Sequence, residues 1–309
     1  MRTLYLSHPS FLMHLTPMGH PERPDRLRVI ERELEREQYQ DLIRDIAPKA
    51  TMEQVARAHP LSYVEHIRVQ NPTEGLIRID GDTSMSPGTW EAALRASGAA
   101  CLAVDEVMTG LVDNAFSAHR PPGHHAEYRT AMGFCFFNHS AVAARHAQEV
   151  HGAERVAIID FDVHHGNGTQ DIFYNDPSVF YASTHQMPLY PGTGELNETG
   201  IANNICNAPL FAGSDGSAFR EAMSSRVLPA LDAFAPDLIL ISAGFDAHTR
   251  DPLGEVDLTE ADFTWVTKRL MEVADRRCKG RIVSLLEGGY DLIGLSRSVA
   301  AHVTALMGH

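Results

Sequence analysis

The sequence predicts an α/β fold built around a parallel sheet, and three observations support this prediction. Short apolar runs alternate along the chain with stretches of helical spacing, which is the pattern of a sheet with helices on its faces. The longest runs are rich in branched residues, which favour strands. Polar residues of chemical interest directly follow several runs, as they do at the carboxyl ends of parallel strands. The expected strands are residues 3–6, 115–117, 156–159, 179–182, 238–241 and 281–286.

The segments between these strands show the spacing of amphipathic helices. Leu27, Ile30 and Leu34 recur three or four positions apart after the first strand, so they predict a helix that buries one face. The segment 186–217 is rich in Pro, Gly and Asn, and we expect it to form long surface loops over the strand ends. Because no linker, internal repeat or low-complexity segment divides the chain, residues 1–309 are expected to form one domain.

The composition excludes several classes of function. A formal net charge of −14 is spread over the chain, and no lysine- or arginine-rich block is present, so we do not expect direct binding to nucleic acid. The first residues lack the apolar stretch of a secretory signal, and no apolar run is long enough to cross a bilayer. We therefore expect no membrane partner. The cysteines are far apart in the sequence, which predicts reduced thiols in a cytoplasmic protein. They are Cys101, Cys135, Cys206 and Cys278.

The run 156–166, Val-Ala-Ile-Ile-Asp-Phe-Asp-Val-His-His-Gly, predicts a metal site. Side chains alternate along an extended chain, so Asp160, Asp162 and His164 are expected to project from one face. Carboxylates near a core are costly unless a cation or hydrogen-bond donors neutralise them, and a divalent metal would do so. A catalytic zinc usually takes three protein ligands, and Asp246, which follows the fifth expected strand, is the best further candidate. Taken alone, an Asp after a strand is more often a helix cap or turn residue.

A second motif, His-Arg-Pro-Pro-Gly-His-His at 119–125, places two imidazoles side by side. The prolines stiffen the loop, and the glycine lets it turn. Adjacent loop histidines are often merely solvated. Here Asp160 and Asn167 could orient the rings of His124 and His125, and an oriented imidazole is the usual general acid or base near neutral pH.

Two further motifs are less specific. Tyr290 follows a strand and two glycines, which would let its hydroxyl donate a hydrogen bond to a developing oxyanion, although such a tyrosine is more often a packing residue. The aromatic segment 133–138, which includes Gly133 and Phe134, could line an apolar tunnel or could simply pack in the core.

Together these motifs resemble the zinc-dependent arginase/deacetylase family, and within it the class II histone deacetylase-like amidohydrolases and acetylpolyamine amidohydrolases. The resemblance runs from Gly-His-Pro-Glu-Arg-Pro-Asp-Arg-Leu at 19–27 to Glu-Gly-Gly-Tyr at 287–290. It includes Arg-Pro-Pro-Gly-His-His, Asp-Phe-Asp-Val-His-His-Gly-Asn-Gly-Thr-Gln and Tyr-Pro-Gly-Thr-Gly, in that order. The resemblance implies a single arginase/deacetylase domain around an eight-stranded parallel sheet, with one catalytic Zn²⁺ and a structural K⁺.

The resemblance also implies the catalytic roles. His125 would be the main general base and acid beside His124, and Tyr290 would be the oxyanion donor. Asn167 stands where class I relatives have Asp, so it should stabilise a protonated His125 less than a carboxylate would. Asp160 would both orient His124 and join a potassium site. The implied zinc ligands are Asp162, His164 and Asp246, and the potassium site would also include Ser183 and backbone carbonyls.

For the substrate, the resemblance implies an acyl-lysine tunnel flanked by Phe134 and Tyr190, with Gly133 beside them. Arg23 would lie beside an inner cavity through which acetate leaves. Leu253 stands at the gate position where polyamine-selective relatives have Glu, which favours acyl-lysine over an acetylated polyamine. The negative net charge favours cationic substrates at long range, but salt weakens that field beyond a Debye length of about 8 Å. Relatives usually have Gly where this chain has Glu255.

Three alternatives stay open at this point. The chain could be an acetylpolyamine amidohydrolase, an acyl-lysine-binding protein without activity, or an arginase-like hydrolase with two metal ions. The expected partner is a small-molecule or peptide acyl-amine, and a homo-oligomer is possible.

Overall fold

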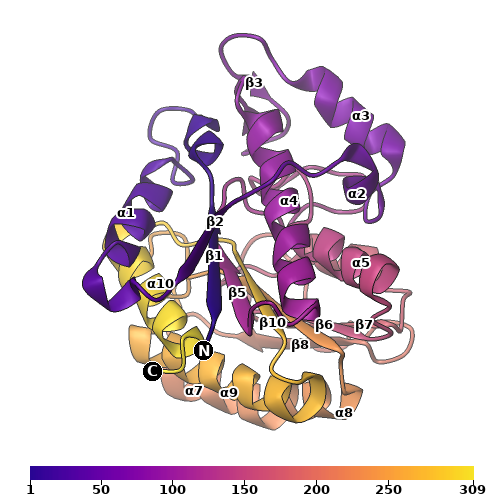
Figure 1. Cartoon of the computed structure of the whole chain (residues 1–309), viewed down its shortest axis with the longest axis vertical. Coiled ribbons are helices and arrows are strands. Elements are labelled where there is room, and N and C mark those ends of the chain that lie inside the picture. The colour runs from indigo at the N-terminus through magenta and orange to yellow at the C-terminus, as the bar shows by residue number, and fades with distance from the viewer.

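The computed structural model describes residues 1–309, and its centre is an eight-stranded sheet with the order β2-β1-β5-β10-β9-β6-β7-β8 (Figure 1). Every neighbouring pair in this sheet is parallel. The predicted α/β class with a parallel eight-stranded sheet is therefore confirmed. The strands are β1 (Thr3–Ser7), β2 (Ile43–Ile46), β5 (Asn114–Ser117), β6 (Val156–Asp160), β7 (Val179–Gln186), β8 (Ile205–Leu210), β9 (Leu238–Ala243) and β10 (Ile282–Leu286). A separate antiparallel ribbon consists of β3 (Ile77–Arg78) and β4 (Ser84–Met85).

Helices cover both faces of the sheet (Figure 1). One layer contains α4 and α5, which pack on each other and on the central strands, whereas α8, α9 and α10 pack on the opposite face. The helices are α1 (Asp25–Leu34), α2 (Met52–Ala56), α3 (Leu61–Gln70), α4 (Thr89–Met108), α5 (His139–His151), α6 (Asn167–Phe173), α7 (Gly216–Ala222), α8 (Leu228–Phe234), α9 (Glu260–Cys278) and α10 (Leu292–Leu306). Shorter helical turns are η1 (Pro9–Met13), η2 (Glu37–Tyr39) and η3 (Met223–Val227).

The apolar spacing explains why α1 packs where it does. Leu27, Ile30 and Leu34 are completely buried, as predicted, and they belong to one hydrophobic core that extends through both helical layers. The charged residues of α1 mostly face solvent. A single continuous core of this kind holds the sheet and its two helical layers together.

The sequence prediction was wrong for part of segment 186–217, because β8 lies inside it and α7 begins at its end. Pro209 lies within β8 and cannot donate to a strand ladder. This is tolerated because β8 is an edge strand that pairs only with β7. The opposite edge strand, β2, was also missed, because its four residues are all exposed and form no apolar run.

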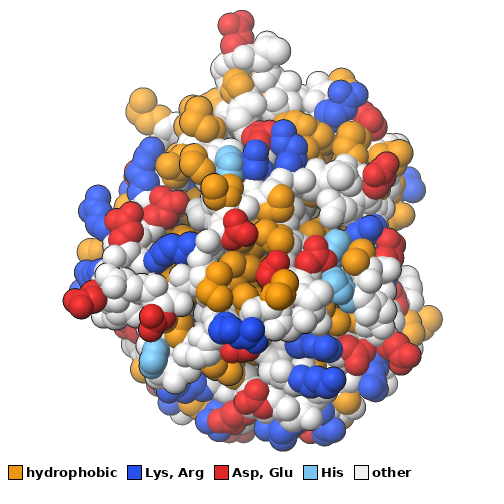
Figure 2. Space-filling view, viewed as in Figure 1, with side chains coloured by type: hydrophobic (Ala, Val, Ile, Leu, Met, Phe, Trp, Pro, Cys, Tyr) orange, Lys and Arg blue, Asp and Glu red, His pale blue; other side chains and the backbone are white.

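The surface agrees with the scattered charge of the sequence. On the face shown in Figure 2, acidic and basic side chains are interspersed and no extended basic area is present. No helix combines the length and the hydrophobicity that crossing a bilayer would require.

The topology brings the chemical motifs together. The central strands β5, β10, β9 and β6 are direct neighbours, and all point the same way. The segments that follow them therefore meet at one edge of the sheet, although they are up to about 170 residues apart in the sequence.

Candidate active site

Asp162, His164 and Asp246 form one buried cluster at the carboxyl ends of β6 and β9. The His164 Nδ1 atom lies 3.1 Å from Asp162 Oδ1 and 3.0 Å from Asp246 Oδ2. The three side chains each present a ligand atom within 4.8 Å of the others. Because β6 ends at Asp160, regular strand alternation does not extend to His164. The irregular turn after β6 instead brings the side chains of Asp162 and His164 together, and Asp160 lies outside the cluster.

The cluster fits a divalent metal ion. Backbone N–H groups hold both aspartates. Asp162 Oδ2 accepts from the Gly288 N–H at 2.8 Å and Asp162 Oδ1 from the His164 N–H at 2.9 Å, and Asp246 Oδ1 accepts from the Val163 N–H at 2.8 Å. These bonds fix the carboxylates as outer-shell partners do around metals. Two carboxylates and an imidazole are a donor set that zinc accepts.

Glycines make room for these carboxylates. A Cβ atom on Gly244 would lie 2.1 Å from Asp162 Oδ2, and a Cβ on Gly288 would lie 2.2 Å from Asp246 Oδ2. No other residue would fit without displacing a ligand atom. Burial, together with the neighbouring charge of Asp162, raises the pKa of Asp246 to about 7 in the absence of a cation. Asp246 is thus poorly compensated by protein groups, whereas the rings of His124 and His164 outweigh burial and lower the pKa of Asp162. The convergence of two buried carboxylates and an imidazole is the arrangement expected of a cation site.

The two histidines that follow β5 lie beside this cluster, each with its own orienting partner. His124 Nδ1 is 2.9 Å from Asp160 Oδ2, and His125 Nδ1 is 2.8 Å from Asn167 Oδ1. The two ring centroids are 4.0 Å apart. The structure therefore brings together all four residues that the sequence analysis paired here.

The Asn167 amide determines which nitrogen of His125 carries the proton. Asn167 Nδ2 donates to Glu127 Oε1 at 2.9 Å, so Asn167 Oδ1 is the atom that faces His125 and can only accept. His125 must therefore carry its proton on Nδ1. Its Nε2 atom keeps a free lone pair, which is the state required of a base.

The charges of the two rings differ. Burial, together with the cationic rings of His124 and His164, lowers the pKa of His125 well below its usual value. Burial acts the same way on His124, but the carboxylates of Asp162, Asp160 and Glu287 outweigh it and raise the pKa of His124 well above its usual value. His125 is thus neutral beside a charged His124.

Tyr290 reaches the same place from the loop after β10. Its ring lies 6.0 Å from that of Phe134, centroid to centroid, and burial raises the pKa of its hydroxyl well above the usual value. The phenol therefore keeps its proton and can act as a hydrogen-bond donor. Asp251 holds this loop, because its Oδ2 atom accepts from the Tyr290 N–H at 2.6 Å.

A cavity of about 280 Å³ leads to these groups. Four residues predicted for the acyl tunnel, Gly133, Phe134, Tyr190 and Leu253, line it together with three residues of the catalytic cluster, His125, His164 and Tyr290. Asp82 and Leu189 also line the cavity and were not anticipated from the sequence, since neither belongs to a motif. Glu255 does not line it; its side chain instead accepts from Gln186 Nε2 at 3.3 Å, and its backbone N–H donates to Gln186 Oε1 at 2.7 Å.

The turn at Gly133 and Phe134 is conformationally unusual. Both residues have positive φ, 56° and 69°, and a Cβ on Gly133 would lie 2.4 Å from the His125 ring. Positive φ is uncommon for a bulky residue, and such strain occurs at functional sites. The glycine lets the tunnel wall approach the histidine closely.

The structure does not support the inner position predicted for Arg23. This side chain is 48% exposed, pairs with Asp25 and lines an open surface hollow. Arg26, three residues later, is completely buried with its guanidinium carbon 4.9 Å from the centroid of the Tyr290 ring. Arg23 precedes α1, whereas Arg26 is on the buried face of that helix, next to Leu27, so the apolar spacing could have identified Arg26.

Two buried carboxylates near the site also escaped the sequence analysis. Glu287 Oε2 accepts from the backbone N–H groups of Gly123 and His124, at 2.6 and 3.1 Å. Asp251 braces the Tyr290 loop and also accepts from the Leu253 N–H at 3.0 Å. The residues predicted for potassium, Asp160 and Ser183, are opposite one another in the register of β6 and β7.

Comparison with known proteins gives a consistent result. A model of the histone deacetylase domain matches residues 20–306. "Histone deacetylase 10, chloroplastic" from Oryza sativa is 44% identical over 86% of this chain and 63% of that protein. The "Histone deacetylase-like amidohydrolase" of Pseudomonas aeruginosa is 42% identical over 79% of this chain and 65% of that protein. The chain thus spans less than two thirds of the length of each of these two relatives.

The fold is also shared with a solved structure. The crystal structure of the HDA15 HD domain superposes with a TM-score of 0.95 and 36% identity, over 100% of this chain and 88% of the other. The name of the rice protein assigns it to the chloroplast, whereas the cytoplasmic location of the present chain stays a prediction.

Proposed function

This chain belongs to the histone deacetylase domain family, and we propose that it is a zinc-dependent amidohydrolase that removes acetyl or other acyl groups from acylated lysine or a similar amine. The observation that carries the proposal is the set of side chains that line one cavity. His125, with its free Nε2, the potential metal ligand His164 and the protonated Tyr290 line the inner part of a tunnel whose other walls are largely apolar. A hydrolase of linear amides needs a base, an electrophile and an oxyanion donor in this arrangement.

Asp162, His164 and Asp246 would hold the zinc ion. When bound, zinc supplies Lewis-acid polarisation of the amide carbonyl and lowers the pKa of water. Asp160 and Ser183 would contribute to a structural potassium ion, a proposal supported by their adjacent positions on β6 and β7.

The protein groups would then divide the proton transfers. His125 Nε2 accepts the proton of the attacking water, because its Nδ1–H is committed to Asn167. Tyr290 donates to the tetrahedral oxyanion, where a preorganised donor is worth most. The charged His124, held by Asp160, favours the developing negative charge electrostatically, and the histidine pair returns a proton to the departing amine.

The walls of the tunnel favour a neutral, extended acyl-amine chain. Phe134 and Tyr190 flank it, and Leu253 provides no charge to attract a polyamine. One observation favours the second candidate, an acetylated polyamine: the carboxyl group of Asp82 also lines the cavity and could pair with a distant ammonium.

The test compares kcat/KM of the zinc-loaded protein on an acetyl-lysine peptide and on an acetylated polyamine, with metal-stripped protein as control. We expect hydrolysis that depends on metal and favours the peptide. The opposite preference would overturn the substrate assignment and implicate Asp82. Binding of the peptide without hydrolysis by the zinc-loaded protein would overturn the enzymatic proposal and identify an acyl-lysine-binding protein.

A further inference from the structure

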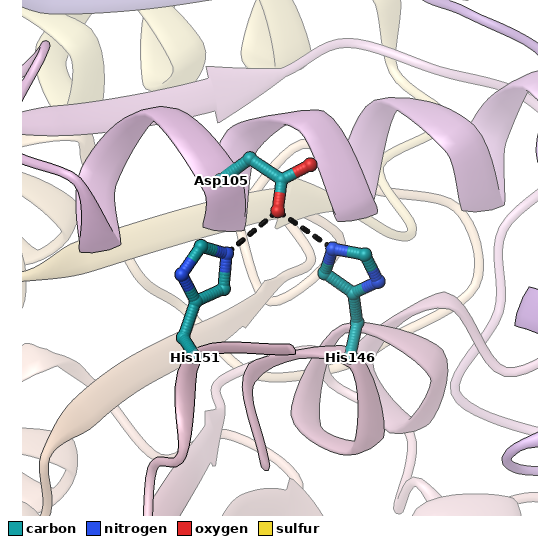
Figure 3. A group of neighbouring side chains, drawn as sticks. All are labelled: Asp105, His146 and His151. Carbon is teal, nitrogen blue, oxygen red and sulfur yellow. Dashed lines mark hydrogen bonds and ion pairs between the residues drawn. The ribbon is translucent and has the colours of Figure 1, made fainter. Parts of the chain in front are cut away.

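A second group of metal-type side chains lies between helices α4 and α5 (Figure 3). Asp105 projects from α4 toward two histidines of α5, His146 and His151. The same Asp105 oxygen, Oδ1, lies 2.7 Å from His146 Nε2 and 2.6 Å from His151 Nε2. One carboxylate oxygen therefore faces two imidazole nitrogens, and the sequence analysis attached no role to any of the three residues.

This group is separate from the catalytic cluster. Helix α4 leads into β5 and α5 leads into β6, so both helices run back to the edge of the sheet where the strands begin. Asp105 lies in the last turn of α4, and His151 is the final residue of α5. The group is thus at the edge opposite the active site, which lies beyond the carboxyl ends of the strands. Gly152, in the left-handed conformation with φ 67°, ends α5 directly after His151.

We propose that Asp105, His146 and His151 form a second metal site, for a divalent transition-metal ion of the zinc type, which cross-links α4 and α5. Two imidazole nitrogens and a carboxylate oxygen are ligands that zinc prefers, and solvent water would complete the coordination. Zinc lies about 2.1 Å from such atoms, so tetrahedral ligands are about 3.4 Å apart. The present contacts need to open by less than about 1 Å, a rotamer-scale adjustment for these side chains.

The site is accessible to an ion. The Asp105 side chain is 41% exposed, whereas His146 and His151 are 5% and 15% exposed. The carboxylate can therefore capture a hydrated ion from solvent, and the two largely buried rings can replace part of its water. The Nδ1 atom of His151 has no hydrogen-bond partner in the protein, so the ring proton can move to Nδ1 when Nε2 binds the ion.

Arg57 controls the affinity of this site. Its Nη1 atom donates to His146 Nδ1 at 2.6 Å, and a guanidinium has no acceptor. His146 Nδ1 must therefore be unprotonated, and the ring proton is on Nε2, where it is donated to Asp105. An ion at Nε2 would move that proton to Nδ1, opposite the Arg57 donor. Arg57 must then turn away, toward Glu149, whose Oε2 atom already lies 2.7 Å from Arg57 Nε.

Competition between Arg57 and the metal ion predicts how a substitution of Arg57 changes the zinc affinity of this site. In the Arg57→Gln variant, the amide oxygen can accept from His146 Nδ1–H, which is the usual orientation for a metal-binding histidine. Outer-shell partners of this kind typically change metal affinity by about 10- to 100-fold. We therefore expect Arg57→Gln to bind the second ion at least about tenfold more tightly than the wild type.

The experiment titrates Zn²⁺ into the metal-free chain of 309 residues by calorimetry, with bound zinc counted after gel filtration. The wild type is expected to bind one more equivalent than either His151→Gln or Asp105→Asn. Both variants keep a polar side chain at a partly exposed position, so they should fold, and their kcat with excess zinc should stay within about twofold of the wild type. Zinc-soaked crystals should show anomalous density between the three side chains.

Three outcomes would overturn the inference. Equal stoichiometry in the wild type and both variants would mean that any additional zinc binds elsewhere. Absence of anomalous density at the three side chains would have the same meaning. Zinc binding by Arg57→Gln that is unchanged or weaker than in the wild type would refute the tautomer argument. None of these readouts depends on the proposed deacylase activity, so failure here and failure of the proposed function are distinguishable.

Discussion

Replacing Asn167 by aspartate tests whether His125 is the catalytic base. Asn167 Oδ1 lies 2.8 Å from His125 Nδ1, in a site that now lowers the pKa of His125 through burial and the neighbouring ring of His124. A carboxylate in place of the amide would favour the charged form of His125 and would raise its pKa. Since kcat/KM falls as the base becomes protonated, the acidic limb of the profile must move to higher pH.

The size of this shift in the pKa of His125 depends on Glu127. An opposite charge at this distance typically raises a pKa by about 1 to 3 units, equivalent to about 1.4 to 4 kcal/mol. Asn167 Nδ2 now donates to Glu127 Oε1 at 2.9 Å, so a new carboxylate would face a second one and lose part of its charge. We expect a shift of about 1 unit for Asn167→Asp, and a shift toward about 3 units when Glu127→Gln is added, because the glutamine amide restores a donor.

The assay is kcat/KM against pH with excess zinc for the wild type, both single variants and the double variant. Glu127→Gln alone is the matched control, since it alters the neighbour without changing the partner of His125. An acidic limb that stays in place or moves to lower pH in both Asn167 variants would mean that another group is the base.

Four further predictions concern the tunnel and the metal. Tyr290→Phe should lower kcat by about 100- to 1,000-fold while the melting temperature changes little, measured by steady-state kinetics and calorimetry; near-normal activity would exclude the oxyanion role. Removal of the metal should abolish turnover. It should also lower the free energy of unfolding by about 2.7 kcal/mol, compared with protein in zinc at 100 times its Kd, and thermal unfolding with and without a chelator will measure this difference. Gly133→Ala should reduce kcat/KM by about 100-fold, because its Cβ would displace the His125 ring, and an unchanged value would show that the turn adapts. Leu253→Glu should raise kcat/KM on an acetylated polyamine by roughly fivefold, the effect of about 1 kcal/mol from a partly exposed charge, and high salt should remove the gain.

The central part of the fold could be predicted from the sequence because buried strands have a strong local signal. The strands β6, β7, β9 and β10 are wholly buried and read as apolar runs. The edge strands lack that signal. Exposed β2 mixes Arg and Asp with isoleucine, and β8 contains asparagine and proline, so only pairing with a neighbour identifies either one as a strand.

The arginines show a similar limit at the level of single residues. Arg23 and Arg26 belong to one short motif and differ by less than one turn of helix, yet one is half exposed and the other is completely buried beside Tyr290. Burial of Arg26 is possible because Nε donates to the Gly289 carbonyl at 2.6 Å and Nη1 to Glu22 Oε1 at 3.1 Å. The Gly289 carbonyl is distant in the sequence, and although Glu22 belongs to the same motif, the motif does not show that its carboxylate is buried beside Arg26.

The acidic residues show why a sequence can indicate where functional residues lie without showing the role of each one. Asp246, Glu287 and Asp291 each follow a buried strand, but the structure gives them three different tasks. Asp246 faces His164, Glu287 holds the loop of His124 by accepting two backbone N–H groups, and Asp291 caps α10 by accepting from the Gly294 N–H at 2.7 Å. A buried carboxylate is stable only where donors or a cation compensate its charge. Glu287 finds donors in the backbone of a neighbouring loop, and Asp291 finds one at a helix start. Asp246 and Asp162 also accept from backbone N–H groups, but one oxygen of each converges on the His164 imidazole. This meeting of three ligand atoms is the physical reason to assign the cation to them.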